Sequence, residues 1–237
     1  MKIWAHRGCS QCYPENTLTA FEKAMNIQGL EGIELDIQLT KDGQIVVIHD
    51  EKVDRTTDST GYIRDYSLSE IKKLLIRTED GLKEHIPTME EVFDLLEPTG
   101  LTINIEMKTG IVMYPQLEEK IVELTNRKGW NDRVIYSSFN HYSVKKIKEL
   151  NPEAKTGLLY ADGPIDMPGY CKTVGADALH PALYNLQFPG FVQECHDKGI
   201  DINVWTVNEE AYMKMAEQWG VHAIITNYPD KARKLLG

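Results

Sequence analysis

The sequence has few of the features of a disulfide-rich or membrane-embedded protein. Among its 237 residues the only cysteines are Cys9, Cys12, Cys171 and Cys195. Their spacing does not give the two close pairs of a structural zinc site, and we interpret the CxxC pair at positions 9 and 12 as two free thiols because no redox-type βαβ pattern follows it. No run of about 18 apolar residues is present, and the apolar stretch at the N-terminus is too short for the core of a signal peptide. We therefore expect a cytoplasmic protein without a membrane span.

Positive charge is also scarce. The chain has 26 Lys and Arg against 36 Asp and Glu, a formal net charge of −10, and no run of Lys and Arg forms a local basic patch. Such a protein repels nucleic acid and anionic lipid surfaces at a distance. We expect no nucleic-acid partner and no stable membrane association. An anionic ligand would need a local reversal of this field, for which a bound divalent cation is a candidate.

Short β-branched runs alternate with amphipathic segments almost from end to end, which is typical of a parallel sheet with crossover helices. The predicted strands are Lys2–His6, Gly32–Ile37, Leu101–Glu106, Arg133–Ser137, Lys155–Leu159, Ala178–His180, Asp201–Trp205 and Ala223–Thr226. The predicted helices are Asn16–Ile27, Thr88–Leu96, Pro115–Lys128, His141–Leu150, Asp166–Val174, Pro189–Lys198, Glu209–Gln218 and Pro229–Leu236. Eight such units predict a closed (β/α)8 TIM barrel that forms one domain over residues 1–237.

One stretch interrupts this rhythm. After the second strand, a turn at Thr40–Gln44 leads into the apolar run Ile45–Ile48, and Glu51–Ile86 is then polar, with one weak helical pattern at Leu68–Leu75. A long segment of little regular structure inside a compact domain is usually a lid or an insertion. We therefore predict a small inserted subdomain, about residues 51–86, over the mouth of the barrel.

Three acidic residues on two predicted strands are candidates for a metal site. Glu34 and Asp36 alternate with apolar residues in Ile33–Ile37, so they share the face that points into the barrel, and Glu106 takes the same face of the third strand. Inward carboxylates are desolvated and repel one another unless a cation compensates them. Oxygen ligands alone suit Mg²⁺ or Ca²⁺. The competing interpretation is a structural salt-bridge cluster in which Lys108 neutralises one of the acids.

Two histidines also follow predicted strand ends. His6 and Arg7 end the first strand, and His49 follows the apolar run after the second. A single histidine in such a place is more often structural. Two of them beside a cation match the need of phosphodiester cleavage for one group that takes a proton and one that gives a proton. The planar guanidinium of Arg7 can bind two phosphate oxygens.

With these residues placed, the chain resembles the glycerophosphodiester phosphodiesterases. The resemblance rests on an ordered series of motifs, each weak by itself. They are His6-Arg7-Gly8, Pro14-Glu15-Asn16-Thr17, Glu34-Leu35-Asp36, His49-Asp50, Glu106-Met107-Lys108, Trp205-Thr206-Val207-Asn208 and Ile225-Thr226-Asn227-Tyr228-Pro229.

The resemblance implies metal-dependent hydrolysis of a small glycerophosphodiester to glycerol 3-phosphate and an alcohol, on a (β/α)8 barrel with an insertion after the second strand. It implies a divalent cation on Glu34, Asp36 and Glu106, and it implies that His6 and His49 are the general acid and base. The motifs leave open which histidine is which, which alcohol is preferred, which cation is native, whether water or an internal hydroxyl attacks, and how the chain assembles.

The same resemblance implies three substrate contacts and one further candidate. Arg7 and Lys108 contact the phosphate, Trp205 lies near the substrate pocket, and Glu15 lies close to the metal site. The two thiols between the first two motifs depart from the pattern, and a disulfide between Cys9 and Cys12 could displace Arg7.

Two alternatives remain at this stage. A phospholipase D-like or phosphoinositide-cleaving barrel would use a similar site on a lipid, but no amphipathic helix rich in aromatic and basic residues is present to lie on a membrane. A non-catalytic barrel that senses a phosphorylated ligand would have no use for two histidines together with three inward acids. An assay on glycerophosphocholine separates the enzyme from the sensor.

Overall fold

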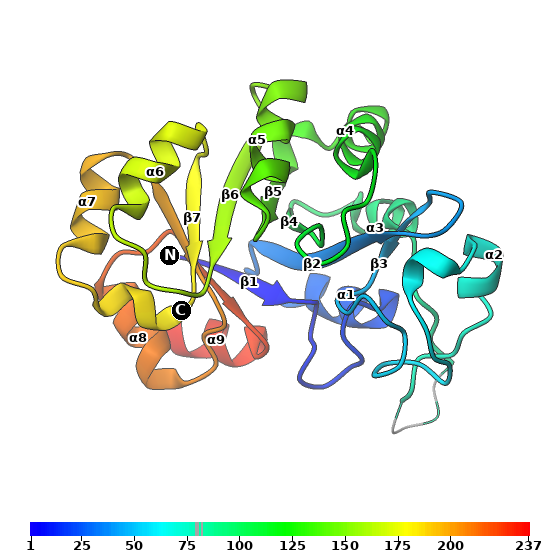
Figure 1. The fold of residues 1–237 in the computed structure, drawn as a ribbon. Helices are drawn as coiled ribbons and strands as arrows, with labels where there is room; N and C mark the ends of the chain where they lie inside the picture. The colour runs from blue at the N-terminus through cyan, green and yellow to red at the C-terminus, as the bar shows by residue number, and fades with distance from the viewer. Residues whose placement is uncertain (79–80, 82) are drawn as a thin grey trace.

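Eight parallel strands close into a ring in the computed structural model, which describes residues 1–78, 81 and 83–237 (Figure 1). These strands are β1 (Lys2–His6), β2 (Gly32–Leu39), β4 (Thr102–Met107), β5 (Val134–Ser138), β6 (Lys155–Tyr160), β7 (Ala178–Pro181), β8 (Asp201–Val204) and β9 (Ala223–Thr226). The ring is closed because β1 pairs with both β2 and β9. The predicted TIM barrel is confirmed, and each strand lies within two residues of its predicted bounds.

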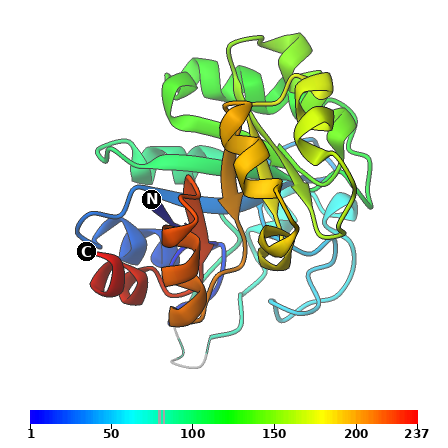
Figure 2. The same ribbon diagram turned by 90° about the vertical axis from the view of Figure 1, so that its left-hand side faces the viewer.

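Helices surround the ring of strands, as two perpendicular views show (Figures 1 and 2). They are α1 (Leu18–Met25), α2 (Leu68–Ile71), α3 (Met89–Leu96), α4 (Leu117–Lys128), α5 (His141–Leu150), α6 (Met167–Val174), α7 (Phe191–Asp197), α8 (Glu210–Gln218) and α9 (Pro229–Leu236). Short 3₁₀ helices occupy Ile63–Asp65, Asn131–Arg133 and Leu183–Gln187. All of the α-helices correspond to predicted helical patterns, with α2 inside the weak pattern at Leu68–Leu75, whereas the 3₁₀ helices were not predicted.

The period-two pattern of β2 sorts its side chains as predicted. Ile33, Leu35 and Ile37 belong to the large hydrophobic cluster between the strands and the surrounding helices. Glu34 and Asp36 are also buried, on the opposite face of the strand. The helices therefore bury the apolar half of the strand, and the carboxylates are left inside the barrel.

Helix α1 begins later than the sequence pattern predicts. Asn16 has φ = 58°, in the left-handed region that asparagine tolerates better than most residues, so it cannot start a right-handed helix. Thr17 is the N-cap instead, and its hydroxyl accepts a hydrogen bond from the Ala20 amide. The side chain of Asn16 is thereby turned away from α1, toward the barrel interior.

The described residues between 51 and 86 form a lobe with a small hydrophobic cluster separate from the barrel's main one. The strand β3 (Ile45–Val47), which is antiparallel to β2, leads into this segment. Its cluster contains Val53, Ile63 and Ile71 together with Val46 at its base. The predicted helix over Leu68–Leu75 is shorter than expected, because only Leu68–Ile71 is α-helical. In Figure 1 this segment, in cyan, projects from the right-hand side of the barrel.

Within the described residues, the structure has no helix that is long and apolar enough to cross a bilayer.

Candidate active site

The three predicted acids lie together at the C-terminal ends of β2 and β4. The carboxylates of Glu34, Asp36 and Glu106 each offer an oxygen atom, and these atoms lie within 4.8 Å of one another. The strand register explains the convergence, since Asp36 pairs with Glu106 across β2 and β4. All three side chains are buried. One oxygen of Asp36, Oδ1, accepts no hydrogen bond from any described residue, which is the condition expected of a ligand atom.

Two cations border this acidic trio. The Nε atom of Arg7 lies 3.2 Å from Asp36 Oδ2, and Lys108 Nζ lies 2.8 Å from Glu106 Oε1. Arg7 has φ = 55°, and its backbone amide donates to Glu34 Oε2 over 3.1 Å. With all three acids ionised, the positive charges of Arg7 and Lys108 neutralise two of the three negative charges, so the group has a net charge of −1. The trio can therefore take a further cation without becoming strongly positive.

Burial and mutual repulsion perturb the ionisation of the trio. Burial raises the pKa of Glu34 well above its ordinary value, and the Asp36 carboxylate raises it further. The same two causes raise the pKa of Glu106. Burial also opposes ionisation of Asp36, but Arg7 and Lys108 outweigh it and hold the pKa of Asp36 below its ordinary value. A bound cation would relieve the repulsion that raises the first two pKa values.

Each of the two predicted histidines is held by one ring nitrogen and presents the other to the site. Nδ1 of His6 lies 2.6 Å from Asn227 Oδ1, so Nδ1 carries a hydrogen and Nε2 faces Glu34. Nδ1 of His49 lies 2.7 Å from Asp50 Oδ1. Burial, reinforced by the charge of Arg7, lowers the pKa of His6 to about 4. His6 is therefore neutral at pH 7 and can accept a proton.

Lys108 connects the second histidine to the acids. Its Nζ atom lies 3.2 Å from His49 Nε2 as well as 2.8 Å from Glu106 Oε1. The structure thus brings one imidazole, one ammonium and one carboxylate together at the mouth of the barrel.

Several side chains that position these groups were not singled out from the sequence. Asn16 Nδ2 donates to Asp36 Oδ2 over 2.9 Å, and Asn227 and Asp50 orient the two histidines as described. These three residues lie inside the recognised motifs, so their neighbourhood was a signal that could have identified them. Ser10 also donates its hydroxyl hydrogen to Asn227 Oδ1, over 3.2 Å, which ties the loop with the CxxC pair to His6.

Glu15 lies in a network at the edge of the site. Its Oε1 atom is 3.1 Å from Arg7 NH1 and 2.6 Å from Arg55 NH2, and the Nε of Arg55 is 2.6 Å from Asp50 Oδ2. Arg55 belongs to the inserted lobe, so this lobe contacts the residues that hold both Arg7 and His49. No local pattern in the sequence could have indicated Arg55.

A pocket of about 430 Å³ opens at the trio, and its two walls differ in character. One wall carries charged and imidazole side chains, among them His6, Arg7 and Glu106. The other wall is apolar and contains Leu159, Phe139 and Trp205. The rings of Phe139 and Trp205 meet edge to face, with centroids 5.5 Å apart. The structure therefore places Trp205 at the pocket, and Phe139 is a lining residue that the sequence did not indicate.

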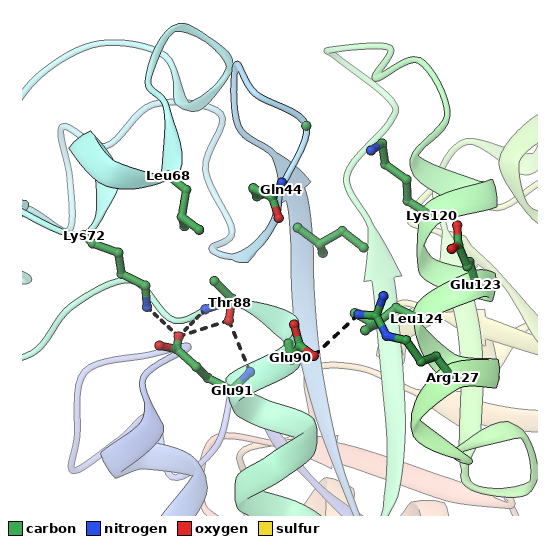
Figure 3. A pocket seen from close by; sticks show the side chains of 12 residues that line it. Gln44, Leu68, Lys72, Thr88, Glu90, Glu91, Lys120, Glu123, Leu124 and Arg127 are labelled. Carbon is green, nitrogen blue, oxygen red and sulfur yellow. Dashed lines mark hydrogen bonds and ion pairs between the residues drawn. The ribbon is translucent and has the colours of Figure 1, made fainter.

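A larger surface pocket, of about 950 Å³, lies elsewhere, between the turn that precedes β3 and the helices α3 and α4 (Figure 3). Ion pairs occupy its walls, such as Lys72 with Glu91 and Arg127 with Glu90. None of the trio, the two predicted histidines or the aromatic pair lines it. We therefore assign the chemistry to the smaller pocket at the barrel mouth.

A closed parallel barrel with carboxylates, imidazoles and cations gathered at the C-terminal ends of its strands has the arrangement of a barrel enzyme. Comparison with known proteins agrees. The model of the glycerophosphoryl diester phosphodiesterase family matches residues 6–231. A glycerophosphodiester phosphodiesterase of Caldanaerobacter subterraneus subsp. tengcongensis is 45% identical over 96% of this chain and 94% of its own, and one of Bacillus altitudinis is 40% identical over 99% and 97%.

Solved structures give the same result. A phosphodiesterase of Oleispira antarctica in complex with the product sn-glycerol-3-phosphate has a TM-score of 0.86 and 27% identity, covering 100% of this chain and 96% of that one. A glycerophosphodiester phosphodiesterase of Thermotoga maritima has a TM-score of 0.82 and 30% identity, covering 98% and 97%. The chain belongs to the glycerophosphoryl diester phosphodiesterase family. It is accordingly an enzyme of the phosphodiesterase class.

Proposed function

We propose that this protein hydrolyses small glycerophosphodiesters to glycerol 3-phosphate and an alcohol. The observation that carries the proposal is the buried trio of Glu34, Asp36 and Glu106, with two imidazoles and two cations beside it, in a chain of this family. The product bound to the Oleispira antarctica phosphodiesterase supports the choice of glycerol 3-phosphate.

The acidic trio is the proposed site of a divalent cation, either Mg²⁺ or Ca²⁺. The donor set fits, because it contains only carboxylate oxygens and Asp36 Oδ1 has no described hydrogen-bond donor. The rival interpretation, a structural salt-bridge cluster, is weaker because Lys108 and Arg7 do not neutralise all three acids. When bound, such a cation would neutralise charge on the phosphodiester and make its phosphorus more electrophilic.

Arg7 and Lys108 are the proposed phosphate-binding residues. Both are cationic, and both already contact the acids over which the phosphate would lie. The planar guanidinium of Arg7 can donate to two oxygens, whereas the ammonium of Lys108 acts as a point charge. Trp205 then lies on the apolar wall, where it would contact the alcohol part of the substrate. Glu15 would act indirectly, by holding Arg7 through the 3.1 Å contact.

His6 and His49 are the proposed general acid and base, acting as a pair. Asn227 and Asp50 fix their Nδ1 atoms, so each presents Nε2 to the pocket. One imidazole takes the proton of the attacking hydroxyl, and the other gives a proton to the leaving alcohol oxygen.

We propose that the attacking hydroxyl is the one next to the phosphorylated carbon of the glycerol. It is tethered near the phosphorus, so its attack gains the effective concentration of an intramolecular reaction. A cyclic phosphate forms first and water then opens it. An analogue without that hydroxyl tests this step: hydrolysis at an undiminished rate would mean that water attacks directly.

Two further proposals concern the chain as a whole. Residues 1–237 act as a single domain in which 51–86 is an inserted subdomain, as its separate hydrophobic cluster suggests. We also infer that the protein works in the cytoplasm, because its four cysteines are free thiols and free thiols persist in reducing compartments.

A hydrolysis screen tests the proposed function. Glycerophosphocholine, glycerophosphoethanolamine and glycerophosphoglycerol are each incubated with Mg²⁺, with Ca²⁺ and after thorough chelation, and glycerol 3-phosphate is measured. We expect turnover with at least one cation and none after chelation. Full activity in the chelated sample would refute the cation. Binding of these diesters without turnover under every condition would favour the phosphoryl-ligand sensor.

A further inference from the structure

Arg55 of the inserted lobe binds two carboxylates at the edge of the active site with one guanidinium group. Its Nε and Nη2 atoms donate to the two oxygens of Asp50, over 2.6 and 3.1 Å. Its Nη1 and Nη2 atoms donate to the two oxygens of Glu15, over 3.1 and 2.6 Å. Four N–H groups of one side chain are used in this way. Only the planar guanidinium of arginine presents such a set of donors, so the position fits arginine alone.

The lobe fixes the place of this guanidinium. Val53 and Thr57, on either side of Arg55 in the chain, are fully buried, and the Thr57 amide donates to the Val53 carbonyl over 3.0 Å. The Arg77 amide donates to the carbonyl of Thr56 over 2.8 Å. The backbone that carries Arg55 is therefore held by the interior of the lobe, and its side chain extends from there to the active site.

The oxygen atoms that Arg55 contacts also hold two groups with proposed roles in the reaction. Asp50 Oδ1, which accepts from Arg55 Nη2, also lies 2.7 Å from His49 Nδ1. Glu15 Oε1, which accepts from the same nitrogen, also accepts from Arg7 over 3.1 Å. One nitrogen of Arg55 thus borders both of the oxygens that orient His49 and Arg7.

Arg55 also keeps both carboxylates ionised. Its hydrogen bonds lower the pKa of Asp50 to about 2. Burial opposes ionisation of Glu15, but Arg55 and Arg7 outweigh it and hold the pKa of Glu15 below its ordinary value. An ionised carboxylate only accepts hydrogen bonds, so Asp50 must receive the Nδ1 hydrogen of His49. The Nε2 atom of that imidazole is then left to face the pocket.

We propose that Arg55 is a positioning residue for two groups of the active site, His49 and Arg7. It acts on the first through Asp50 and on the second through Glu15, without contacting the substrate. The inserted lobe therefore completes a site whose assigned groups all lie outside it. This inference rests on the proposed function, which assigns proton transfer to His49 and phosphate binding to Arg7.

Steady-state kinetics separates the two effects. The substrate and the cation are those with the highest turnover in the screen described above. Asp50→Asn should lower kcat by about 10–100-fold and leave KM nearly unchanged, because only the proton-transfer group loses its partner. Glu15→Gln should raise KM by about tenfold with little change in kcat, because a phosphate contact present before and during the reaction is weakened. Arg55→Gln should show both effects.

Double variants give a readout that a purely structural role would not produce. In the Asp50→Asn background, Arg55→Gln should lower kcat no further and should still raise KM. In the Glu15→Gln background, it should raise KM no further and should still lower kcat. Residues that act through one another are non-additive in this way, whereas a loosened lobe would add the same loss in every background.

Arg64→Gln is the matched control. It removes the same charge from the same lobe, at an exposed arginine whose guanidinium lies over the Tyr62 ring and outside the active-site pocket, and it should leave kcat and KM unchanged. Arg55→Lys is made alongside, because an ammonium group keeps the charge but cannot donate in pairs to both carboxylates. It should show both losses to a smaller extent, and it tests them if Arg55→Gln does not fold.

The outcomes separate this inference from the proposed function. If the wild type hydrolyses the diester, and both Arg55 variants have the kcat and KM of Arg64→Gln, the positioning role is overturned and the proposed function stands. Losses that multiply in both double variants overturn it as well, since Arg55 would then act independently of Asp50 and Glu15. No turnover of any diester with any cation refutes the proposed function, and this inference with it.

Discussion

Replacing Glu34 by Gln should stabilise the metal-free protein and at the same time weaken its response to metal. Burial and the Asp36 carboxylate raise the pKa of Glu34, so ionised Glu34 is destabilising in the absence of a cation. Two carboxylate oxygens that lie within 4.8 Å of one another repel by at least about 3 kcal/mol at an effective dielectric constant of about 20. Glutamine has the same shape without the charge, and its Oε1 can still accept the hydrogen bond from the Arg7 amide.

The effect has a defined pH dependence. The pKa of Glu34 is higher in the folded than in the unfolded state. Its protonated form therefore contributes fully to the free energy of unfolding below the unfolded-state pKa of about 4.3. That contribution is lost as the pH rises through the folded-state pKa. The stability advantage of Glu34→Gln should therefore grow above pH ~4.3, by up to about 1.4 kcal/mol per pH unit. Since a domain of this size gains about 2–4 °C per kcal/mol, the metal-free Tm should rise by up to about 10 °C at pH 7.

Saturating metal should remove most of the advantage of Glu34→Gln. A cation at 100 times its Kd stabilises the wild-type protein by about 2.7 kcal/mol, whereas a variant that binds it 100-fold more weakly gains only about 0.4 kcal/mol. The Tm of the wild type and of Glu34→Gln is measured by scanning calorimetry at pH 5, 6 and 7, with chelator and with Mg²⁺ or Ca²⁺. The control is Glu123→Gln, which changes an exposed acid on α4. A metal-free Tm that falls in Glu34→Gln, with an unchanged metal-induced shift, would refute the reasoning for the site.

Three further predictions concern catalysis, specificity and stability. His6→Ala and His49→Ala should each lower kcat by about 10²–10⁴-fold. The kcat of the double variant should be little lower than that of the slower single variant, because both histidines act in one proton-transfer sequence. Losses that multiply in the double variant would contradict this. Replacing residues 51–86 by a short Gly/Ser turn should change the order of preference among diesters, and an unaltered profile in a folded variant would exclude that role. Burial lowers the pKa of His180 to about 3, so its contribution to stability is present above pH ~6.5 and is lost as the pH falls. The free energy of unfolding, measured with urea, should therefore fall less steeply between pH 6.5 and 4 in His180→Gln than in the wild type. Equal dependence on pH in the two proteins would rule out His180 as the cause.

Local periodicity was sufficient to predict the barrel and its inward-facing acids. In β2, apolar residues at alternate positions pack against the helices, so Glu34 and Asp36 must point inward. The parallel register then places Glu106 beside Asp36. These results depend on two features. One is the two-residue repeat of a strand, and the other is the parallel direction of the strands, which follows from the alternation of strand and helix patterns along the sequence. The catalytic roles of the histidines, in contrast, came from the motifs and stay a prediction.

Sequence pattern alone determined the order of strands and helices, the place of the insertion and the face on which the acids lie. Only the tertiary structure decided which distant loops meet: Asn227 holds His6 across 221 positions, Arg55 reaches Glu15 from the inserted lobe, and Phe139 contacts Trp205. The physical reason is that the end of a closed barrel gathers loops from all along the chain. The contacts among those loops depend on their lengths and turns in three dimensions, which no repeat in the sequence encodes.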